Sequence, residues 1–275
     1  EQVDQILMKN FGSKTPKIFS YFDRTPIASA SIGQVHQAIL RSTNERVVVK
    51  LLRPEIKEIM AQDLSILMEF ATWISKKSIW AEKLGFRDLA MGFAHALQEE
   101  IDFEMEARNM IQVQTVMKKN LQHIKIPKVY REFSTNSVLV MEYVNGSSVS
   151  EASVLFDSLE VERKQFAEML LFSFLEQALV SGIFHSDPHP GNIFIEDETN
   201  HITLLDFGAV GRLGALQQEG LKLFLVGVHQ NNAVVVTDGV QLLVENAEDI
   251  IPEELEQQIN DILLRISYID HIEAS

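Results

Sequence analysis

The chain has 275 residues, enough for about two domains or lobes, and 46% of its residues are hydrophobic, so it can form a large core. Its 24 Lys and Arg residues against 39 Asp and Glu residues give a net charge of −15, which argues against a nucleic-acid partner because an acidic surface repels phosphate backbones. The absence of cysteine excludes disulfide bonds, zinc ribbons and thiol catalysis.

The first half of the chain predicts strands with helices between them. An apolar pattern of helical spacing ends at Gly12, a residue that often closes a helix, and after Pro26 the pattern changes to period two. In chain order we expect a helix over residues 4–11, strands over 35–40 and 47–52, helices over 55–76 (after Pro54 at the first helical position) and 87–119, and strands over 128–133 and 137–144.

The second half is predicted to be mainly helical. We expect a long helix from residue 160 to about Gly182, strands over 193–195 and 202–205, and helices over 213–230 and 252–267. The apolar stretch 169–184 contains Glu176 and Gln177 and falls short of the ~20 residues that a bilayer requires, so no membrane span is expected. The sheet-bearing and helical halves meet near Asn145 and Gly146, and the expected fold class is α+β.

The sharpest chemical signal is a trio of polar residues in the second half. Asp187 lies five residues before Asn192 in a Pro-rich loop, and Asp206 follows the next predicted strand in the sequence Asp-Phe-Gly. Kinases use Asp, Asn and Asp in this order to hold metal and to position the acceptor. We expect Asn192 and Asp206 to bind Mg²⁺, which prefers oxygen ligands, and Asp187 to orient or deprotonate the attacking hydroxyl or water.

The first half supplies a matching loop and lysine. The loop fits the glycine-rich loop of kinases with alanine at the first two glycine positions, and its members are Ala28, Ser29, Ala30, Ser31, Ile32, Gly33 and Val35. Lys50 ends an apolar run at the position of the kinase strand lysine. Burying a lysine there is costly unless its ammonium pairs with anions, and a pair of phosphates and a helix Glu could supply them.

Residues 137–146 fit the strand and hinge that present backbone groups to adenine. We expect Met141, Glu142 and Val144 at this hinge. The side chains expected to enclose the ring are Val35, Val48 and Phe194. Together with the lysine and the polar trio, these residues predict a site for ATP and Mg²⁺.

With these residues in place, the sequence resembles the UbiB/ADCK family of atypical kinases in the protein-kinase-like superfamily. The motifs that carry the resemblance lie between Ile27 and Leu213: A-S-A-S-I-G-Q-V-H, V-V-V-K-L-L-R-P, E-I-D-F-E-M-E-A-R-N, F-H-S-D-P-H-P-G-N-I and L-L-D-F-G-A-V-G-R-L. The resemblance implies a bilobal fold, with a small N-terminal lobe over residues 1–144 and a mainly helical lobe over 145–275. It also implies Mg-ATP bound between the lobes and support of ubiquinone or other isoprenoid-quinone biosynthesis.

The resemblance also implies roles for an acidic segment. Glu106 would pair with Lys50, and Glu100 and Asp102 match the E-x-D motif that lies near the phosphates. Spacing alone leaves Glu100, Glu104 and Glu106 open as partners of Lys50. Without the resemblance, such an acidic run is usually a solvated helix face.

The chain departs from the family pattern at both ends. The K-x-G-Q motif expected upstream of Ala28 is absent from residues 1–27, and the transmembrane helices expected after the last residue are absent as well. We therefore expect a catalytic-core fragment of a cytoplasmic protein that is membrane-associated in its full-length form. The implied partners are the nucleotide, isoprenoid-quinone precursor lipids, quinone-biosynthesis proteins, and a membrane surface reached through regions absent from this chain.

The type of reaction is indicated by the residues after the Asp-Phe-Gly sequence. No Ser, Thr or Tyr occurs between Gly208 and Val236, and a helical pattern begins at Leu213. Kinases that phosphorylate proteins have a long activation segment here, so we expect ATP hydrolysis or phosphorylation of a small molecule. Alanine in place of glycine in the Ala28 loop also predicts slow turnover, because alanine restricts the approach of the backbone to phosphates.

Two other functions fit parts of the sequence. One is a nucleotide-binding pseudokinase that serves as a scaffold for quinone-pathway enzymes. The other is a metal-dependent hydrolase that uses His185 and His189, but Pro188 and Pro190 prevent the helix that would align them. We expect one of these histidines to support the loop through a backbone hydrogen bond instead.

Overall fold

The computed structural model describes residues 2–29, 32–78, 80–81, 84–117, 124–151, 163–197, 201–244 and 251–273, with only the backbone for residues 267–273. The chain divides into two compact units, one formed by residues 1–163 and 186–210 and the other by residues 164–185 and 211–275. The expected lobes over residues 1–144 and 145–275 stay a prediction. The two compact units are not the same as these lobes, because the segment 186–210 belongs to the unit that contains the N-terminal strands.

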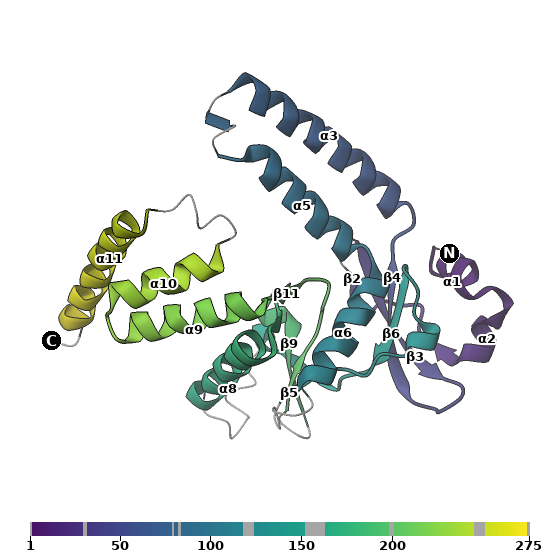
Figure 1. The fold of residues 1–275 in the computed structure, drawn as a ribbon. Helices are drawn as coiled ribbons and strands as arrows, with labels where there is room; N and C mark the ends of the chain where they lie inside the picture. Colours follow the sequence, from purple (N-terminus) through teal and green to yellow (C-terminus); the bar gives the residue numbers. More distant parts are fainter. Residues whose placement is uncertain are drawn as a thin grey trace. The chain divides into compact units, whose positions relative to one another are not determined.

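A five-stranded antiparallel sheet is the centre of the first unit (Figure 1). Its strands are β1 Phe19–Phe22, β2 Ala28–Ser29, β3 Gly33–Leu40, β4 Arg46–Leu52 and β6 Val138–Glu142, in the order β1-β3-β4-β6 with β2 paired to β3. Val47, Val49 and Leu51 of β4 are buried in a core that includes helix α1, Gln2–Phe11. Because side chains alternate along a strand, Val48 and Lys50 lie on the opposite face.

A four-stranded sheet also belongs to this unit. Its strands, in the order β5-β10-β9-β7, are β5 Ile124–Lys125, β10 Ile202–Leu204, β9 Ile193–Glu196 and β7 Gly146–Ser148. β9 and β10 form an antiparallel pair, whereas β5 runs parallel to β10. Since β6 belongs to the first sheet and β7 to the second, residues 143–145 connect the two sheets.

The main helices of this unit follow β4. They are α3 Ile56–Lys77, α5 Phe86–Glu100 and α6 Phe103–Met117. A short helix, α2 Thr15–Ile18, precedes β1. α3 and α5 pack side by side (Figure 1). The single helix expected over residues 87–119 is wrong. Asp102 divides it, because its Oδ1 accepts the backbone N–H of Glu104 at 3.0 Å and so begins a new helix.

Two further expectations for this unit are corrected. α3 begins at Ile56 after Glu55, whose φ of 66° is left-handed, so Pro54 precedes the helix instead of occupying its first position. The strand expected over residues 128–133 is reduced to an isolated bridge between Val129 and Met141, and a 3₁₀ helix covers Arg131–Phe133. The backbone carbonyl of Lys128 accepts the N–H of Glu142 at 2.8 Å, and the N–H of Tyr130 donates to the carbonyl of Val140 at 2.9 Å, so pairing with β6 stops where the 3₁₀ helix begins.

The second unit is mainly helical. Its elements are α8 Arg163–Glu176, a π-helical turn Gln177–Ser181, β8 Ile183–His185 paired with β11 Val210–Arg212, α9 Ala215–His229, α10 Ala233–Leu243 and α11 Pro252–Glu273. Gly182, at φ 67°, ends the expected long helix. α10 was not expected from the sequence. It is capped by Asn232, whose Oδ1 accepts the N–H groups of Val234 and Val235.

The α+β class expected from the sequence is confirmed by this arrangement of strands and helices. Among the described residues, no helix is long and apolar enough to cross a membrane.

Candidate functional site

A cavity of about 390 Å³ lies in the first unit, between the two sheets and the segment that connects them. Many of the residues predicted for a nucleotide site line it: Ala28, Val35, Val48, Lys50, Met141, Glu142, Val144, Asn192, Phe194 and Asp206. They come from chain segments as far apart as β2 and the end of β10, so the fold brings together what the sequence separates. The cavity has an apolar part at Val35, Val48 and Phe194, and a charged end at Lys50 and Asp206.

Lys50 is the centre of the charged end. Its Nζ donates a hydrogen bond to Oε1 of Glu106 at 2.6 Å and lies 3.6 Å from Oδ2 of Asp206. Burial lowers the pKa of Lys50, but the negative charges of Glu106 and Asp206 outweigh it and raise the pKa above its ordinary value. Lys50 is therefore a fixed cation, and of the three candidate partners left open by spacing, Glu106 is the one it contacts.

Helix α6 connects this ion pair to the Asp-Phe-Gly segment. The backbone N–H of Phe207 donates to Oε1 of Glu106 at 3.4 Å, and the backbone carbonyl of Phe207 accepts a bond from Nδ2 of Asn109 at 2.9 Å. All three residues are buried. Sequence reasoning missed Asn109, although a polar residue three positions after Glu106 lies on the same helix face and was a usable signal.

Asp187 and Asn192 lie together in the loop before β9. Nδ2 of Asn192 is 3.3 Å from both the carbonyl oxygen and Oδ2 of Asp187. The loop is tightened by His189, whose Nδ1 accepts the N–H of Gly191 at 3.0 Å, which is the kind of support expected of a histidine here. The backbone N–H of Leu205 donates to the carbonyl of Asn192 at 2.7 Å and so fixes the loop beside Asp206.

Asp206 has an unusual backbone conformation. Its φ is 60°, in the left-handed region that few residues other than glycine adopt, and its Oδ1 accepts the N–H of Gly208 at 3.3 Å. Its side chain is half exposed and faces the cavity with Asn192. Strained backbone of this kind is concentrated at functional sites, where the surrounding fold holds it in place.

The donor set at the charged end fits a hard cation such as Mg²⁺. Asn192 and Asp206 offer one amide and one carboxylate group, and Mg²⁺ needs only one or two protein ligands when phosphates and waters supply the rest. In the described part of the chain, no group of three or more His, Asp or Glu side chains could hold a metal ion by itself. A cation here would therefore depend on oxygens of a bound ligand.

Four of the predicted acidic residues do not line the cavity: Glu106 and Asp187, described above, and Glu100 and Asp102. Glu100 ends α5, and burial together with the charges of Asp206 and Asp187 raises its pKa above the ordinary value. Asp102 caps α6 through its bond to Glu104. Glu100 therefore adds negative charge to the polar end of the cavity, while Asp102 fixes the helix that carries Glu106.

Of the described residues of the predicted Ala-rich loop, Ala28 and Val35 line the cavity, and they pair across β2 and β3. Ser29, Ile32 and Gly33 do not line it, and Ala30 and Ser31 lie outside the described residues. A Cβ atom on Gly33 would lie 2.9 Å from the carbonyl oxygen of Leu51, so glycine is required there by close packing of β3 on β4.

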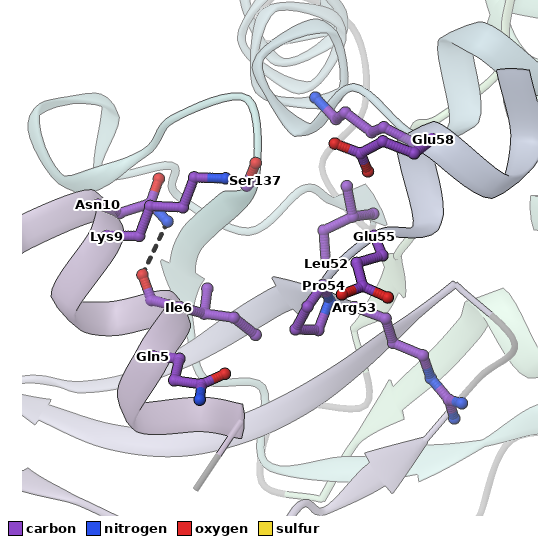
Figure 2. Close-up of a pocket in the computed structure, with 11 residues that line it drawn as sticks. Gln5, Ile6, Lys9, Asn10, Leu52, Arg53, Pro54, Glu55, Glu58 and Ser137 are labelled. Atoms are coloured by element: carbon purple, nitrogen blue, oxygen red, sulfur yellow. Dashed lines mark hydrogen bonds between the residues drawn. The ribbon is translucent and has the colours of Figure 1, made fainter.

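A smaller cavity of about 240 Å³ lies between α1 and the start of α3 (Figure 2). Its charged side chains are mixed in sign: Lys9, Arg53, Lys57, Glu55 and Glu58. None of the residues predicted for catalysis, cofactor or metal lines it. The candidate functional site is therefore the larger cavity around Lys50.

Comparison with known proteins gives a consistent family assignment. Residues 1–239 match the model of the ABC1 atypical kinase-like domain. The protein ACTIVITY OF BC1 COMPLEX KINASE 8, chloroplastic, of Arabidopsis thaliana is 37% identical over 234 residues, which cover 82% of this chain and 30% of that protein. The probable protein kinase UbiB of Pseudomonas fluorescens is 35% identical over 223 residues, which cover 79% of this chain and 41% of that protein.

The chain therefore spans less than half the length of these relatives. A crystal structure of Rad53 residues 1–466 with AMP-PNP aligns with 94% of this chain and 55% of that chain, at 17% sequence identity and a TM-score of 0.38.

Proposed function

Since the chain belongs to the ABC1 atypical kinase-like family, we propose that it binds Mg-ATP in the cavity around Lys50 and acts as an atypical kinase or ATPase. The observation that carries this proposal is the position of the Lys50 ammonium, 2.6 Å from Glu106 and 3.6 Å from Asp206 at the wall of one cavity. A cation held between a buried helix carboxylate and a second carboxylate is the arrangement that kinases use to bind phosphates.

Each part of the cavity has a role in this proposal. The apolar side chains Val35, Val48 and Phe194 would hold the adenine ring, and the backbone of residues 142–144 would offer it hydrogen bonds. Lys50 would bind the phosphates, with Glu106 keeping the ammonium in place. Mg²⁺, held by Asn192 and Asp206, supplies charge neutralisation for the phosphate oxygens.

Asp187 is the proposed group for proton transfer. Its bond with Asn192 places its carboxylate next to one of the proposed magnesium ligands. From there it would orient the attacking hydroxyl or water and accept its proton. Positioned acid–base groups of this kind commonly contribute ~10²–10⁴-fold to the rate.

We propose water or a small molecule as the acceptor. Only six residues separate Gly208 from the start of α9 at Ala215, and none of them is Ser, Thr or Tyr. This stretch is too short for the segment with which kinases hold peptide substrates. For the full-length protein we propose a role in isoprenoid-quinone biosynthesis at a membrane surface, with precursor lipids and other quinone-pathway proteins as partners.

The test is to measure binding and turnover separately. Binding of Mg-ATP and formation of ADP are compared between the wild type, Asp187→Asn, and Asp238→Asn, which changes an exposed carboxylate of α10. Asp187→Asn should bind Mg-ATP within twofold of the wild type and lose ~10²–10⁴-fold in turnover, and Asp238→Asn should match the wild type. If the wild type binds Mg-ATP but forms no ADP, in the presence or absence of an isoprenoid phenol, the chain is a scaffold and the proposed enzyme activity is refuted.

A further inference from the structure

Lys125 lies where the two sheets of the first unit are connected. Its Nζ is 2.7 Å from Oε1 of Glu142, the last residue of β6, and 3.0 Å from Oε1 of Glu196, the last residue of β9. β6 belongs to the five-stranded sheet and β9 to the four-stranded sheet. One ammonium group on β5 therefore links the two sheets beside residues 143–145, which pass from one sheet to the other.

Both carboxylates are themselves held in place. Oε2 of Glu142 accepts the backbone N–H of Lys128 at 3.1 Å, and Oε1 of Glu196 accepts the hydroxyl of Thr203 at 3.0 Å. The side chains of Lys125, Glu142 and Glu196 are 35%, 32% and 12% exposed. Exposed ion pairs contribute little to stability. A partly buried network with charge-assisted hydrogen bonds and fixed partners contributes more.

The network contains one positive charge, on Lys125, and two carboxylates, on Glu142 and Glu196. Burial lowers the pKa of Lys125, but its hydrogen bonds with Glu142 and Glu196 and their charges outweigh it and raise the pKa above its ordinary value. Lys125 is thus a permanent cation between two carboxylates. Without it, two carboxylate oxygens that both lie within 3.0 Å of Nζ would repel each other and push β6 and β9 apart.

This link lies next to the candidate site. Glu142 lines the larger cavity, as do the neighbouring residues Met141, Tyr143 and Val144. The cavity is bounded by both sheets, with Val48 and Lys50 from β4 on one side and Phe194 from β9 on the other. The separation of the two sheets at residues 143–145 therefore sets the width of the apolar end of the cavity.

We infer that Lys125 is a positioning residue that holds the two sheets together at residues 143–145 and thereby sets how long a nucleotide stays in the cavity. The inference rests on the proposed nucleotide binding, and it assigns Lys125 no contact with the nucleotide. Lys125 acts through Glu142 and Glu196. Its loss should accelerate nucleotide dissociation more than it changes the rate of the chemical step.

The matched control for this inference is on the same segment. Lys128 also carries an ammonium near a carboxylate, with its Nζ 4.0 Å from Oε1 of Glu45, and its side chain lies over the ring of Tyr130. Lys128→Met removes that charge but keeps the backbone N–H that bonds to Glu142. Lys125→Met and Lys128→Met therefore remove the same charge, but only the first breaks the link between the sheets.

The experiment has one arm without nucleotide and one with it. Amide hydrogen exchange of residues 143–147 is measured in the ligand-free wild type, Lys125→Met, Lys125→Arg and Lys128→Met. Dissociation of a fluorescent Mg-ADP analogue and the kcat and KM for ATP are then measured in the same four proteins. We expect Lys125→Met to speed exchange about tenfold and dissociation three- to tenfold, with kcat within twofold of the wild type, whereas Lys125→Arg and Lys128→Met stay within twofold throughout.

The outcomes separate this inference from the function on which it rests. If exchange and dissociation in Lys125→Met stay within twofold of the wild type, or if Lys128→Met changes them equally, the inference is overturned. It is also overturned if Lys125→Met lowers kcat and leaves dissociation unchanged. If the wild type binds no nucleotide while Lys125→Met still speeds exchange tenfold, the link between the sheets stands, and the proposed function and the role in nucleotide residence are both overturned.

Discussion

Asn109 on α6 donates a hydrogen bond of 2.9 Å to the backbone carbonyl of Phe207, and both residues are buried. Glu106, one turn earlier on the same helix, bonds both to Lys50 and to the backbone N–H of Phe207. One helix face therefore fixes the lysine and the Asp-Phe-Gly segment at the same time. Phe207, the residue after Asp206, is held at its N–H by Glu106 and at its C=O by Asn109, and this fixes the backbone that directs Asp206 into the cavity.

Asn109→Asp should destabilise the protein and weaken Mg-ATP binding. The variant keeps the shape of the side chain but replaces the donor near the carbonyl of Phe207 with an acceptor, which leaves a buried polar group unsatisfied at a cost of about 1–3 kcal/mol. Urea unfolding and a nucleotide titration measure the two effects. Asn136→Asp, at an exposed position, is the control. Equal stability and equal affinity in both variants would refute the role assigned to Asn109.

Lys50→Met should lower the free energy of unfolding much more than the same substitution at an exposed lysine. It leaves the buried Glu106 without its cation, and breaking a buried ion pair in this way costs about 3–5 kcal/mol. The double variant Lys50→Met/Glu106→Gln should recover part of that loss. Lys222→Met, which breaks an exposed pair with Glu219, should cost at most about 1 kcal/mol. Urea unfolding of the four proteins tests this, and an Lys50→Met variant as stable as Lys222→Met contradicts it.

The stability of the first unit should fall with pH below about 6.5 because of His36. This residue is fully buried, with Nδ1 3.0 Å from the carbonyl of Asp23, and burial lowers its pKa. As the pH falls, His36 becomes protonated in the unfolded chain before it does so in the folded protein. The stability that comes from keeping His36 neutral is therefore fully present above the pKa of the unfolded state, and it is lost as the pH falls toward the pKa of the folded state. The free energy of unfolding of the wild type minus that of His36→Gln should shrink between pH 7.5 and pH 5.5. A constant difference would contradict this assignment.

Ala28→Gly should raise the affinity for Mg-nucleotide. Ala28 lines the cavity at the first glycine position of the expected loop, and removal of its methyl group lets phosphates approach the backbone more closely. A change of several-fold in the dissociation constant is expected from titration, together with a change in autophosphorylation. If neither quantity changes, the side chain at this position does not limit the phosphate geometry.

The sequence predicted most of the site because its residues are recognisable by type and order. Lys50, Asn192, Phe194 and Asp206 line one cavity, and the family membership and the α+β class expected from the sequence are confirmed. The catalytic and binding roles of these residues stay predictions. The contact between Lys50 and Glu106 could not be chosen from spacing alone, since three glutamates were near enough in sequence and only the direction of α6 decides among them.

The features that the sequence missed depend on tertiary bonds and local capping. Asp102 ends one helix and begins another, an effect that the continuous apolar pattern over residues 87–119 conceals. The 3₁₀ helix Arg131–Phe133 cuts short a strand expected over residues 128–133. Asn109 and Lys125 carry no motif, and their partners Phe207, Glu142 and Glu196 come from distant parts of the chain. Such residues are recognised only when the fold brings their partners to them.

Calorimetric titration of this chain can show whether Lys50, Asn192 and Asp206 form one site for Mg-ATP. Mg-ATP is titrated into the wild type and into Asp206→Asn, which weakens a proposed ligand of the cation, and ATP without magnesium is titrated into both. We expect one Mg-ATP per chain in the wild type and at least about tenfold weaker binding in Asp206→Asn, with a smaller difference when magnesium is omitted. Absence of binding in the wild type, or equal affinity of the two proteins for Mg-ATP, would contradict this expectation.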